Sequence, residues 1–190
     1  MERESAVSLA GLYSKVLNVR LTLAIEEHKI LGEVQNGFRK ERCGSDNNFI
    51  LDTIIWKAKA TRAPLHLSFL DISKAYDSIN RGILWKKLYS IGIKGEFLSC
   101  LKALYTDDCI DCEVNGLLTR PIYLRRGLRQ GCSLSPILFA IYISGVGNDA
   151  TLSQLGFSIG NVCISALLFA DDLVLIARSG VGLRSLLNLV

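Results

Sequence analysis

The feature that most limits how this chain can fold is a pair of adjacent aspartates between two apolar runs. Residues 162–169 and 173–177 have the composition of buried strands, and Ala170-Asp171-Asp172 separates them. Two short apolar runs joined in this way predict a β-hairpin with both acids at its tip. A carboxylate there must be hydrated, paired or bound to a cation. Taken alone, the pattern fits a solvent-exposed Asp-Asp turn equally well.

Asp71 adds a third acid in a similar setting, because it directly follows the short apolar run 65–70, which reads as a strand. If that strand neighbours the hairpin, Asp71, Asp171 and Asp172 converge. Convergent carboxylates suit hard divalent cations with oxygen ligands. Two such ions about 4 Å apart can hold the attacking and leaving oxygens of an in-line phosphoryl transfer. Mg²⁺ fits best, since it accepts a few carboxylates and takes its other ligands from water and substrate phosphates.

The rest of the chain reads as a mixture of helices and strands without an internal repeat. Its 190 residues suffice for one large domain or two small ones. An apolar fraction of 49% with a net charge of only +4 excludes a largely disordered chain. Hydrophobic spacing, caps and turn residues predict helices over 13–27, 47–60, 80–90, 95–106 and 135–144, and a hairpin around Asn115-Gly116.

No apolar stretch approaches the ~18 residues of a membrane span, and the first residues lack the apolar core of a secretory signal. We therefore expect an intracellular protein, in the nucleus or the cytoplasm, with no membrane partner. In a reducing compartment the six cysteines are expected to be free thiols, including the pair Cys109 and Cys112.

Positive charge gathers in one part of the sequence. Between positions 114 and 148 there is no acidic residue, but there are four arginines, at 120, 125, 126 and 129. Such a stretch attracts a phosphate backbone or a nucleoside triphosphate. A solvated arginine face is the alternative explanation.

Three segments together resemble the catalytic motifs of reverse transcriptases, most closely those of the non-LTR retrotransposon (LINE-type) group. They are Asp71-Ile-Ser-Lys-Ala-Tyr-Asp77, Gly127-Leu-Arg-Gln-Gly-Cys-Ser-Leu-Ser-Pro136 and Phe169-Ala-Asp-Asp172. Upstream, Gln35-Asn-Gly-Phe-Arg39 and the stretch 13–21 are similar to the fingers region of that group. An Ala-Asp-Asp triplet is common by chance, so the order and the separations of the three motifs carry the resemblance.

The resemblance implies an α+β fold: the palm of a right-hand polymerase, with an antiparallel sheet and packed helices. It assigns residues 1–66 to a partial fingers region and 67–190 to the palm, with no thumb. We expect the thumb and endonuclease regions of a parent polyprotein to be missing from this chain. One departure stands out, because Ser5 occupies the place of an arginine that the family usually carries before Ser8-Leu9.

The resemblance also assigns roles to the acids. Asp71, Asp171 and Asp172 would bind two Mg²⁺ ions, for which Mn²⁺ can substitute, and would activate the 3′-hydroxyl of a primer.

The same resemblance places five residues at the nucleotide. Tyr76 would lie under the incoming sugar and crowd a 2′-hydroxyl, Gln130 and Gly131 would line the nucleotide and template, and Lys15 and Arg39 would serve the triphosphate or the template. Read without the motifs, Tyr76 is an ordinary core tyrosine, and Lys15 and Arg39 are surface charges.

The function implied is RNA-directed DNA polymerisation, in which a nucleotide passes from a dNTP to the 3′-hydroxyl of a DNA primer on an RNA template. One alternative is an inactive retroelement remnant that serves only as a nucleic-acid-binding or interaction module. Another is an unrelated metal-dependent phosphotransferase, which would fit the carboxylates but not the loop around Gln130.

Overall fold

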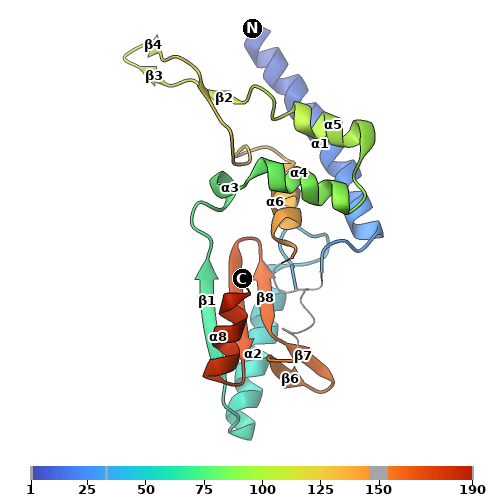
Figure 1. Cartoon of the computed structure of the whole chain (residues 1–190), viewed down its shortest axis with the longest axis vertical. Coiled ribbons are helices and arrows are strands. Elements are labelled where there is room, and N and C mark those ends of the chain that lie inside the picture. The colour runs from blue at the N-terminus through green and yellow to red at the C-terminus, as the bar shows by residue number, and fades with distance from the viewer. Residues whose placement is uncertain (1, 33, 146–153, 190) are drawn as a thin grey trace. The chain divides into compact units, whose positions relative to one another are not determined.

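The computed structural model describes residues 2–32, 34–145 and 154–189. Helices and short antiparallel strands follow one another in it, as expected for an α+β chain (Figure 1). In chain order the elements are α1 (Glu2–Glu27), α2 (Gly44–Thr61), β1 (His66–Asp71), α3 (Ala75–Ser78), α4 (Arg81–Ser90), α5 (Gly95–Ala103), β2 (Cys109–Ile110), β3 (Glu113–Val114), β4 (Leu117–Leu118), β5 (Ile122–Tyr123), α6 (Ser135–Ile143), β6 (Phe157–Ile159), β7 (Val162–Ile164), β8 (Ala166–Phe169), β9 (Asp172–Ala177) and α8 (Gly180–Asn188).

The chain divides into two compact units, each built from two separate segments. The first unit comprises Met1–Ala24 and Lys74–Tyr142, and the second comprises Ile25–Ser73 and Ile143–Val190. The division at residue 66 into fingers and palm stays a prediction.

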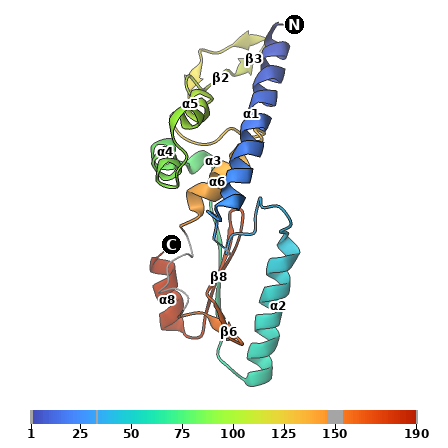
Figure 2. The same ribbon diagram turned by 90° about the vertical axis from the view of Figure 1, so that its right-hand side faces the viewer.

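The second unit is built around a three-stranded antiparallel sheet with the order β1-β9-β8. Helices α2 and α8 cover its two faces (Figure 2). Alternation along a strand sends neighbouring side chains to opposite faces, so an apolar run such as 173–177 can be buried on both. On the α2 side the buried core consists of Ile54, Ala58, Phe157, Leu167 and Ile176.

The apolar run 162–169, expected as one strand, is two strands that belong to different sheets. Residues up to Ile164 pair with β6, and residues from Ala166 pair with β9. Ser165 lies between them outside either strand, although its carbonyl oxygen still accepts a hydrogen bond from the Ile176 N–H (2.8 Å). The break lets one continuous apolar segment serve two separate strand pairs.

The first unit is built mainly from helices and also carries the short strands β2 to β5. Asn80 caps α4 as expected, because its side-chain oxygen accepts a hydrogen bond from the Ile83 N–H (3.2 Å). Helix α5 ends at Ala103, three residues before its expected end. Apolar side chains buried in this unit include Leu17, Leu21, Leu84, Leu88, Leu98, Leu101, Leu134 and Leu138.

An exposed two-stranded ribbon joins α5 to the loop before α6. Strand β2 pairs with β5, and β3 pairs with β4. Its tip is the expected Asn115-Gly116 turn, in which both residues have positive φ values, 52° and 79°. These angles are typical of a two-residue hairpin turn, so the local prediction is confirmed.

Two further expectations concern the chain as a whole. The six cysteines are free thiols. Within the described ranges, no helix combines the length and the apolar character needed to cross a membrane.

Candidate functional site

Two of the three predicted carboxylates lie directly opposite each other in the second unit. Asp71 is the last residue of β1 and Asp172 the first residue of β9, and the two are register partners in the antiparallel ladder. Directly opposite residues present their side chains on the same face of a sheet. Both residues are exposed. The neighbouring strands expected for these acids are therefore present.

The third acid, Asp171, lies in the turn that joins β8 to β9. Phe169 pairs with Asp172, so Ala170 and Asp171 alone make the turn. Ala170 has a φ of 56°, in the left-handed region that a residue with a Cβ seldom adopts. The side chain of Asp171 is half-buried, one residue before the exposed Asp172.

A buried glutamine from a distant part of the sequence holds this turn. The Gln35 side chain donates to the Ala170 carbonyl oxygen (3.3 Å) and accepts from the Ala170 N–H (3.2 Å). It also accepts from the Gly37 N–H (2.7 Å). The sequence comparison singled out residues 35–39 without giving Gln35 a role. The local sequence Val34-Gln35-Asn36-Gly37 gives no sign that this side chain is buried.

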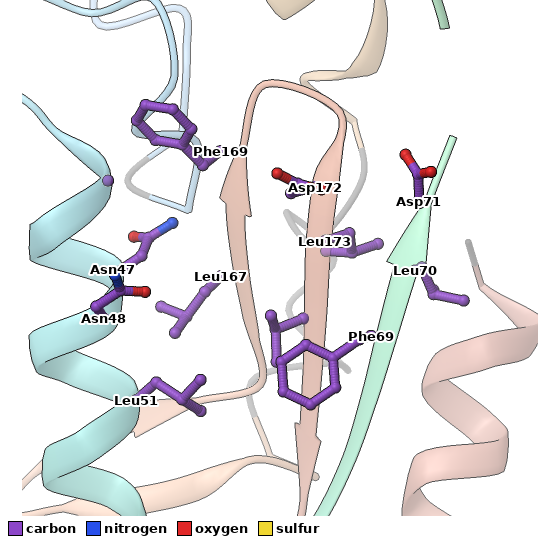
Figure 3. Close-up of a pocket in the computed structure, with 12 residues that line it drawn as sticks. Asn47, Asn48, Leu51, Phe69, Leu70, Asp71, Leu167, Phe169, Asp172 and Leu173 are labelled. Atoms are coloured by element: carbon purple, nitrogen blue, oxygen red, sulfur yellow. The ribbon is translucent and has the colours of Figure 1, made fainter. Parts of the chain in front are cut away.

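A cavity of about 400 Å³ opens on the sheet face that carries the carboxylates. Phe69 and Phe169 contribute rings to it, and Asn47 and Asn48 contribute amides from α2 (Figure 3). Asp71 and Asp172 line the end of the cavity nearest the β8–β9 turn (Figure 3). The Phe69 ring is two-thirds exposed, with a relative accessibility of 67%. Aromatic faces and amides beside two carboxylates offer contacts for both the apolar and the polar parts of a ligand.

The chemistry of this donor set fits a divalent cation. Asp71 and Asp172 offer exposed carboxylate oxygens on one face, and Mg²⁺ is typically held by one or two carboxylates together with water and phosphate oxygens. In the part of the chain that the structure describes, no group of three or more His, Cys, Asp or Glu side chains is placed to hold a metal ion. The structure thus brings Asp71 to Asp172, with Asp171 adjacent in the turn.

In the first unit, a second cavity of about 340 Å³ brings together three of the residues predicted to bind the nucleotide. Lys15 reaches it from α1, and Gln130 and Gly131 line it from the loop before α6. Gly131 has a φ of 79°, which a residue with a Cβ adopts only under strain. Arg129 also lines the cavity, so two cationic side chains face one space.

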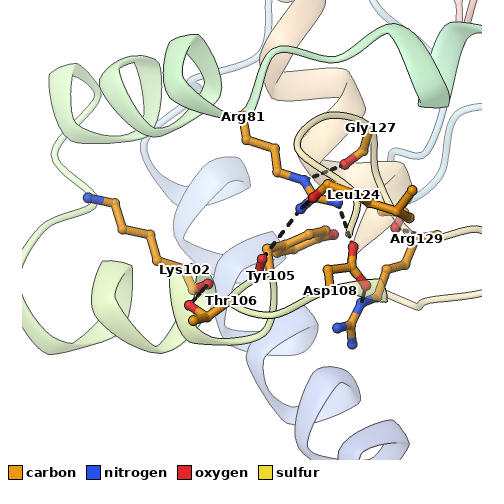
Figure 4. Close-up of polar contacts among 9 residues, drawn as sticks. Arg81, Lys102, Tyr105, Thr106, Asp108, Leu124, Gly127 and Arg129 are labelled. Atoms are coloured by element: carbon orange, nitrogen blue, oxygen red, sulfur yellow. Dashed lines mark hydrogen bonds and ion pairs between the residues drawn. The ribbon is translucent and has the colours of Figure 1, made fainter. Parts of the chain in front are cut away.

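A buried ion network, which the sequence did not reveal, supports the loop that carries Gln130 (Figure 4). Arg81 donates to the Asp108 carboxylate (2.5 Å) and to the carbonyl oxygens of Gly127 and Leu124 (2.8 Å each). Arg129 donates to the other Asp108 oxygen (2.8 Å). Arg81 and Asp108 each have only 8% of their surface exposed. The network therefore ties the start of α4 to the loop 124–129.

Tyr105 packs beneath this network and lines the second cavity. Both the Arg81 and the Arg129 guanidinium groups lie over its ring, at 4.8 Å and 5.7 Å. Burial raises the pKa of the Tyr105 hydroxyl, and the nearby Ser135 hydroxyl and the arginines oppose that rise only in part. Among the described residues, the hydroxyl has no hydrogen-bond partner of normal geometry. The Ser135 hydroxyl donates its own proton to the Arg129 carbonyl oxygen (2.5 Å).

Arg39 and Tyr76 are both held by neighbours within their own units. The Arg39 guanidinium makes two hydrogen bonds to the Glu26 carboxylate (2.9 and 3.1 Å) and another to the Gly32 carbonyl oxygen (3.2 Å). With its side chain 8% exposed, Arg39 is not a free surface charge. The half-buried Tyr76 ring stacks on Phe139, with ring centres 5.2 Å apart.

Known proteins resemble this chain over most of its length. The family model described as "Reverse transcriptase (RNA-dependent DNA polymerase)" matches residues 5–190. The retrovirus-related Pol polyprotein of the type-1 retrotransposable element R2 from Nasonia vitripennis is 31% identical over 96% of this chain. The corresponding R2 polyprotein from Popillia japonica is 30% identical over 97%, and that of the type-2 element R2DM from Drosophila melanogaster is 28% identical over 96%.

The chain spans only part of these relatives: 18%, 26% and 17% of their lengths, respectively. A solved structure of telomerase from Candida albicans, in complex with a fragment of telomeric RNA, has a TM-score of 0.58 to this chain. It is 15% identical and covers 96% of this chain and 31% of the telomerase chain. At this identity the likeness concerns the fold alone.

Proposed function

The chain belongs to the reverse transcriptase family, and we propose that it forms the catalytic core of an RNA-directed DNA polymerase. The telomerase likeness and the antiparallel sheet with packed helices confirm the α+β fold expected for such a core. The observation that carries the proposal is the register pairing of Asp71 with Asp172 at the strand ends, beside Asp171 in the turn.

In this proposal Asp71, Asp171 and Asp172 hold two Mg²⁺ ions, with Mn²⁺ as a substitute. When bound, the ions supply positive charge to the attacking and leaving oxygens of an in-line phosphoryl transfer. The carboxylates would bind the ions and set their positions, because each carboxylate lies at the end of a strand or in a two-residue turn. On their own the carboxylates would oppose loss of the proton from the 3′-hydroxyl of a primer, because their negative charge disfavours a nearby alkoxide, and the bound cations would offset that charge.

We assign the incoming dNTP to residues of the first unit. The Tyr76 ring, fixed by its stacking on Phe139, would crowd a 2′-hydroxyl and favour deoxynucleotides. Gln130 can both donate and accept hydrogen bonds, and Gly131 lets a backbone approach closely. Lys15 lines the same cavity and would serve a phosphate as a point charge.

Arg39 was expected to serve the triphosphate or the template. Its paired bonds to Glu26 and its contact with the Gly32 carbonyl favour a structural role in the loop that follows α1. Its role at the triphosphate or the template stays a prediction.

The proposed partners are an RNA template and a DNA primer. Arg120, Arg125 and Arg126 lie in or beside the exposed ribbon, and all three sit in the stretch that lacks acidic residues. Exposed arginines of this kind can contact the phosphates of a nucleic acid, and such contacts do not depend on its base sequence.

Primer extension tests the proposal. The purified chain is incubated with a DNA primer annealed to RNA, dNTPs and Mg²⁺, and Asp171→Asn is compared with Asp52→Asn, which alters an exposed acid of α2. We expect Mg²⁺-dependent extension that Asp171→Asn abolishes and Asp52→Asn preserves. Binding of primer-template without any extension would instead indicate the inactive, nucleic-acid-binding remnant. Extension that survives Asp171→Asn would refute the assignment of the metal site.

A further inference from the structure

The Gln35 side chain is placed to control the backbone of the turn that carries the acids. It is 98% buried, with a relative accessibility of 2%, and reaches across 135 positions of sequence to Ala170. One amide satisfies both backbone polar groups of that single residue, the N–H at 3.2 Å and the carbonyl oxygen at 3.3 Å. A backbone fixed at both groups cannot rotate without breaking one of the two bonds.

Ala170 needs such support, because its φ of 56° is unfavourable for a residue with a Cβ. Strained backbone persists only where the surroundings hold it in place. Asp171 follows directly in the turn, so the peptide planes at Ala170 help to set where its carboxylate lies. Asp172 is also held by its pairing with Asp71, so a change of Ala170 toward an ordinary φ would mainly move Asp171 away from the other two acids.

The segment around Gln35 is itself anchored to the hairpin. The Leu168 N–H donates to the Val34 carbonyl oxygen (3.0 Å), and the Asn36 N–H donates to the Leu168 carbonyl oxygen (2.9 Å). These bonds form a parallel bridge between Gln35 and Leu168. The amide is thus held against the same strand whose turn it supports.

Gly37 completes the contact. Its N–H donates to the Gln35 side-chain oxygen (2.7 Å), which fixes the orientation of the amide. A Cβ at this position would overlap the backbone nitrogen of Ala170, so the chain can approach the turn this closely only with glycine.

From these contacts we propose that Gln35 is a positioning residue, which holds the Ala170-Asp171 turn in the conformation that lets Asp171 and Asp172 bind a divalent cation. The proposal rests on the proposed function, because it takes these acids as metal ligands. Gln35 itself does not touch the metal or the substrates; it acts through the backbone of Ala170.

The chemistry of the position requires an amide. Methionine has a similar length but can neither donate to the Ala170 carbonyl nor accept usefully from two N–H groups. Glutamate could accept from both N–H groups, but it would face the Ala170 carbonyl oxygen without a donor and would bury a charge. Replacing Ala170 by glycine removes the penalty of the left-handed conformation, and so should make the turn less dependent on Gln35.

The experiment measures two properties that do not require catalysis. Mn²⁺ binding to the purified chain is followed by electron paramagnetic resonance, and hydrogen exchange of the Ala170 amide is followed by NMR. The variants are Gln35→Met, Gln35→Glu, Ala170→Gly and the double variant Gln35→Met/Ala170→Gly. Ile54→Val, a change in the buried core of the same unit, controls for a simple loss of stability.

We expect Gln35→Met and Gln35→Glu to weaken Mn²⁺ binding by about 10- to 100-fold, the range found for groups that orient metal ligands. The Ala170 amide should exchange faster in both. Ala170→Gly alone should bind Mn²⁺ like the wild type, and adding it to Gln35→Met should restore part of the affinity. Ile54→Val should leave the affinity unchanged.

Wild-type affinity in a folded Gln35→Met or Gln35→Glu variant would overturn the proposal. An equal loss of affinity in Ile54→Val would also overturn it, because general destabilisation would then explain the effect. If the wild type binds no Mn²⁺, or if Asp171→Asn binds as the wild type does, the proposed function itself fails. Exchange at the Ala170 amide would still show whether Gln35 holds the turn.

Discussion

Asp71 and Asp172 face each other across the β1–β9 ladder, as two carboxylates on adjacent strands and on one face of the sheet. Like charges placed directly opposite each other in a sheet are destabilising, so the fold carries an unfavourable pair at this point. The same arrangement becomes favourable once a cation lies between the two side chains. In the proposed function, the lower stability without metal is the consequence of placing two carboxylates where they bind a cation.

Replacing one of these acids should separate the repulsion between the carboxylates from the stabilisation by a bound cation. Without divalent metal, we expect Asp172→Asn to be at least as stable as the wild type, by up to about 1 kcal/mol, because the repulsion is relieved. Millimolar Mg²⁺ should raise the melting temperature of the wild type but not that of the variant, since only the wild type binds the ion in its folded state. Asp52→Asn, which alters an exposed acid of α2, should respond to Mg²⁺ like the wild type. An equal rise in Asp172→Asn would contradict the assignment.

The buried hydroxyl of Tyr105 should reduce stability. A buried polar group without a partner costs about 1–3 kcal/mol, so Tyr105→Phe should be more stable than the wild type by urea denaturation near neutral pH. Tyr123→Phe, which removes a hydroxyl from an exposed ring of the ribbon, serves as the comparison. A clear loss of stability in Tyr105→Phe would show that the hydroxyl is satisfied in solution.

The pH dependence of stability offers a second test of Tyr105. Burial raises the pKa of this residue above its ordinary value of 10.0. As the pH rises past that value, the unfolded chain loses the proton first while the folded chain keeps it. The wild type should therefore lose stability above about pH 10 more steeply than Tyr105→Phe does. Denaturation curves at about pH 8 and about pH 11 measure the difference. Parallel losses in the two proteins would exclude a raised pKa.

The ion pair between Arg81 and Asp108 should show strong coupling. Asp108→Ala leaves the Arg81 guanidinium buried and unpaired, which should cost about 3–5 kcal/mol of folding free energy. Arg81→Met should cost at least as much, because the Gly127 and Leu124 carbonyls also lose a donor. The double variant should cost less than the sum of the two single changes.

Chemical denaturation of the four proteins in this cycle gives the coupling energy directly. Asp111→Ala, which removes an exposed acid from the neighbouring ribbon, should change stability by no more than about 0.5 kcal/mol. If the changes in unfolding free energy caused by the Arg81 and Asp108 substitutions were strictly additive, the interaction between the two side chains would contribute nothing to stability.

Helix α1 carries two apolar faces with different roles. Leu21 is fully buried, whereas Leu23 is 65% exposed and belongs to an exposed row with the 3–4 spacing of one helix face: Leu9, Leu12, Val16, Val19 and Leu23. We expect Leu21→Ala to cost about 2–5 kcal/mol and Leu23→Ala no more than about 0.5 kcal/mol. Replacing the exposed row by serine should reduce the binding of a hydrophobic dye. Equal destabilisation by the two leucine changes would contradict the burial seen here.

Tyr76 is the position at which sugar selection can be tested. Tyr76→Val removes the ring and should shift the ratio of ribonucleotide to deoxynucleotide incorporation by about tenfold or more toward ribonucleotides. Tyr76→Phe keeps the ring on Phe139 and should retain the selectivity of the wild type. Single-nucleotide extension with matched dNTP and rNTP pairs measures the ratio. Unchanged selectivity in Tyr76→Val would favour the reading of Tyr76 as an ordinary core tyrosine.

The sequence alone determined the features that depend on residues close together in the chain. Asn80 caps α4 because its side chain reaches an N–H three residues away. Asn115 and Gly116 form the ribbon turn because both tolerate positive φ. The order of the three motifs likewise identified the family, because a motif is recognised from its residue types and their separation along the chain.

Only the tertiary structure decided which distant groups meet. The sequence predicted that Asp71 would lie near the hairpin acids if the strands were neighbours. The alternation of a strand does not fix the register with its neighbour, so only the structure shows that Asp71 lies directly opposite Asp172. The contact between Gln35 and Ala170 joins residues 135 positions apart, and that between Arg81 and Asp108 joins residues 27 apart. The hydrogen-bond partner of a buried polar side chain depends on the tertiary packing, so the local sequence does not predict it.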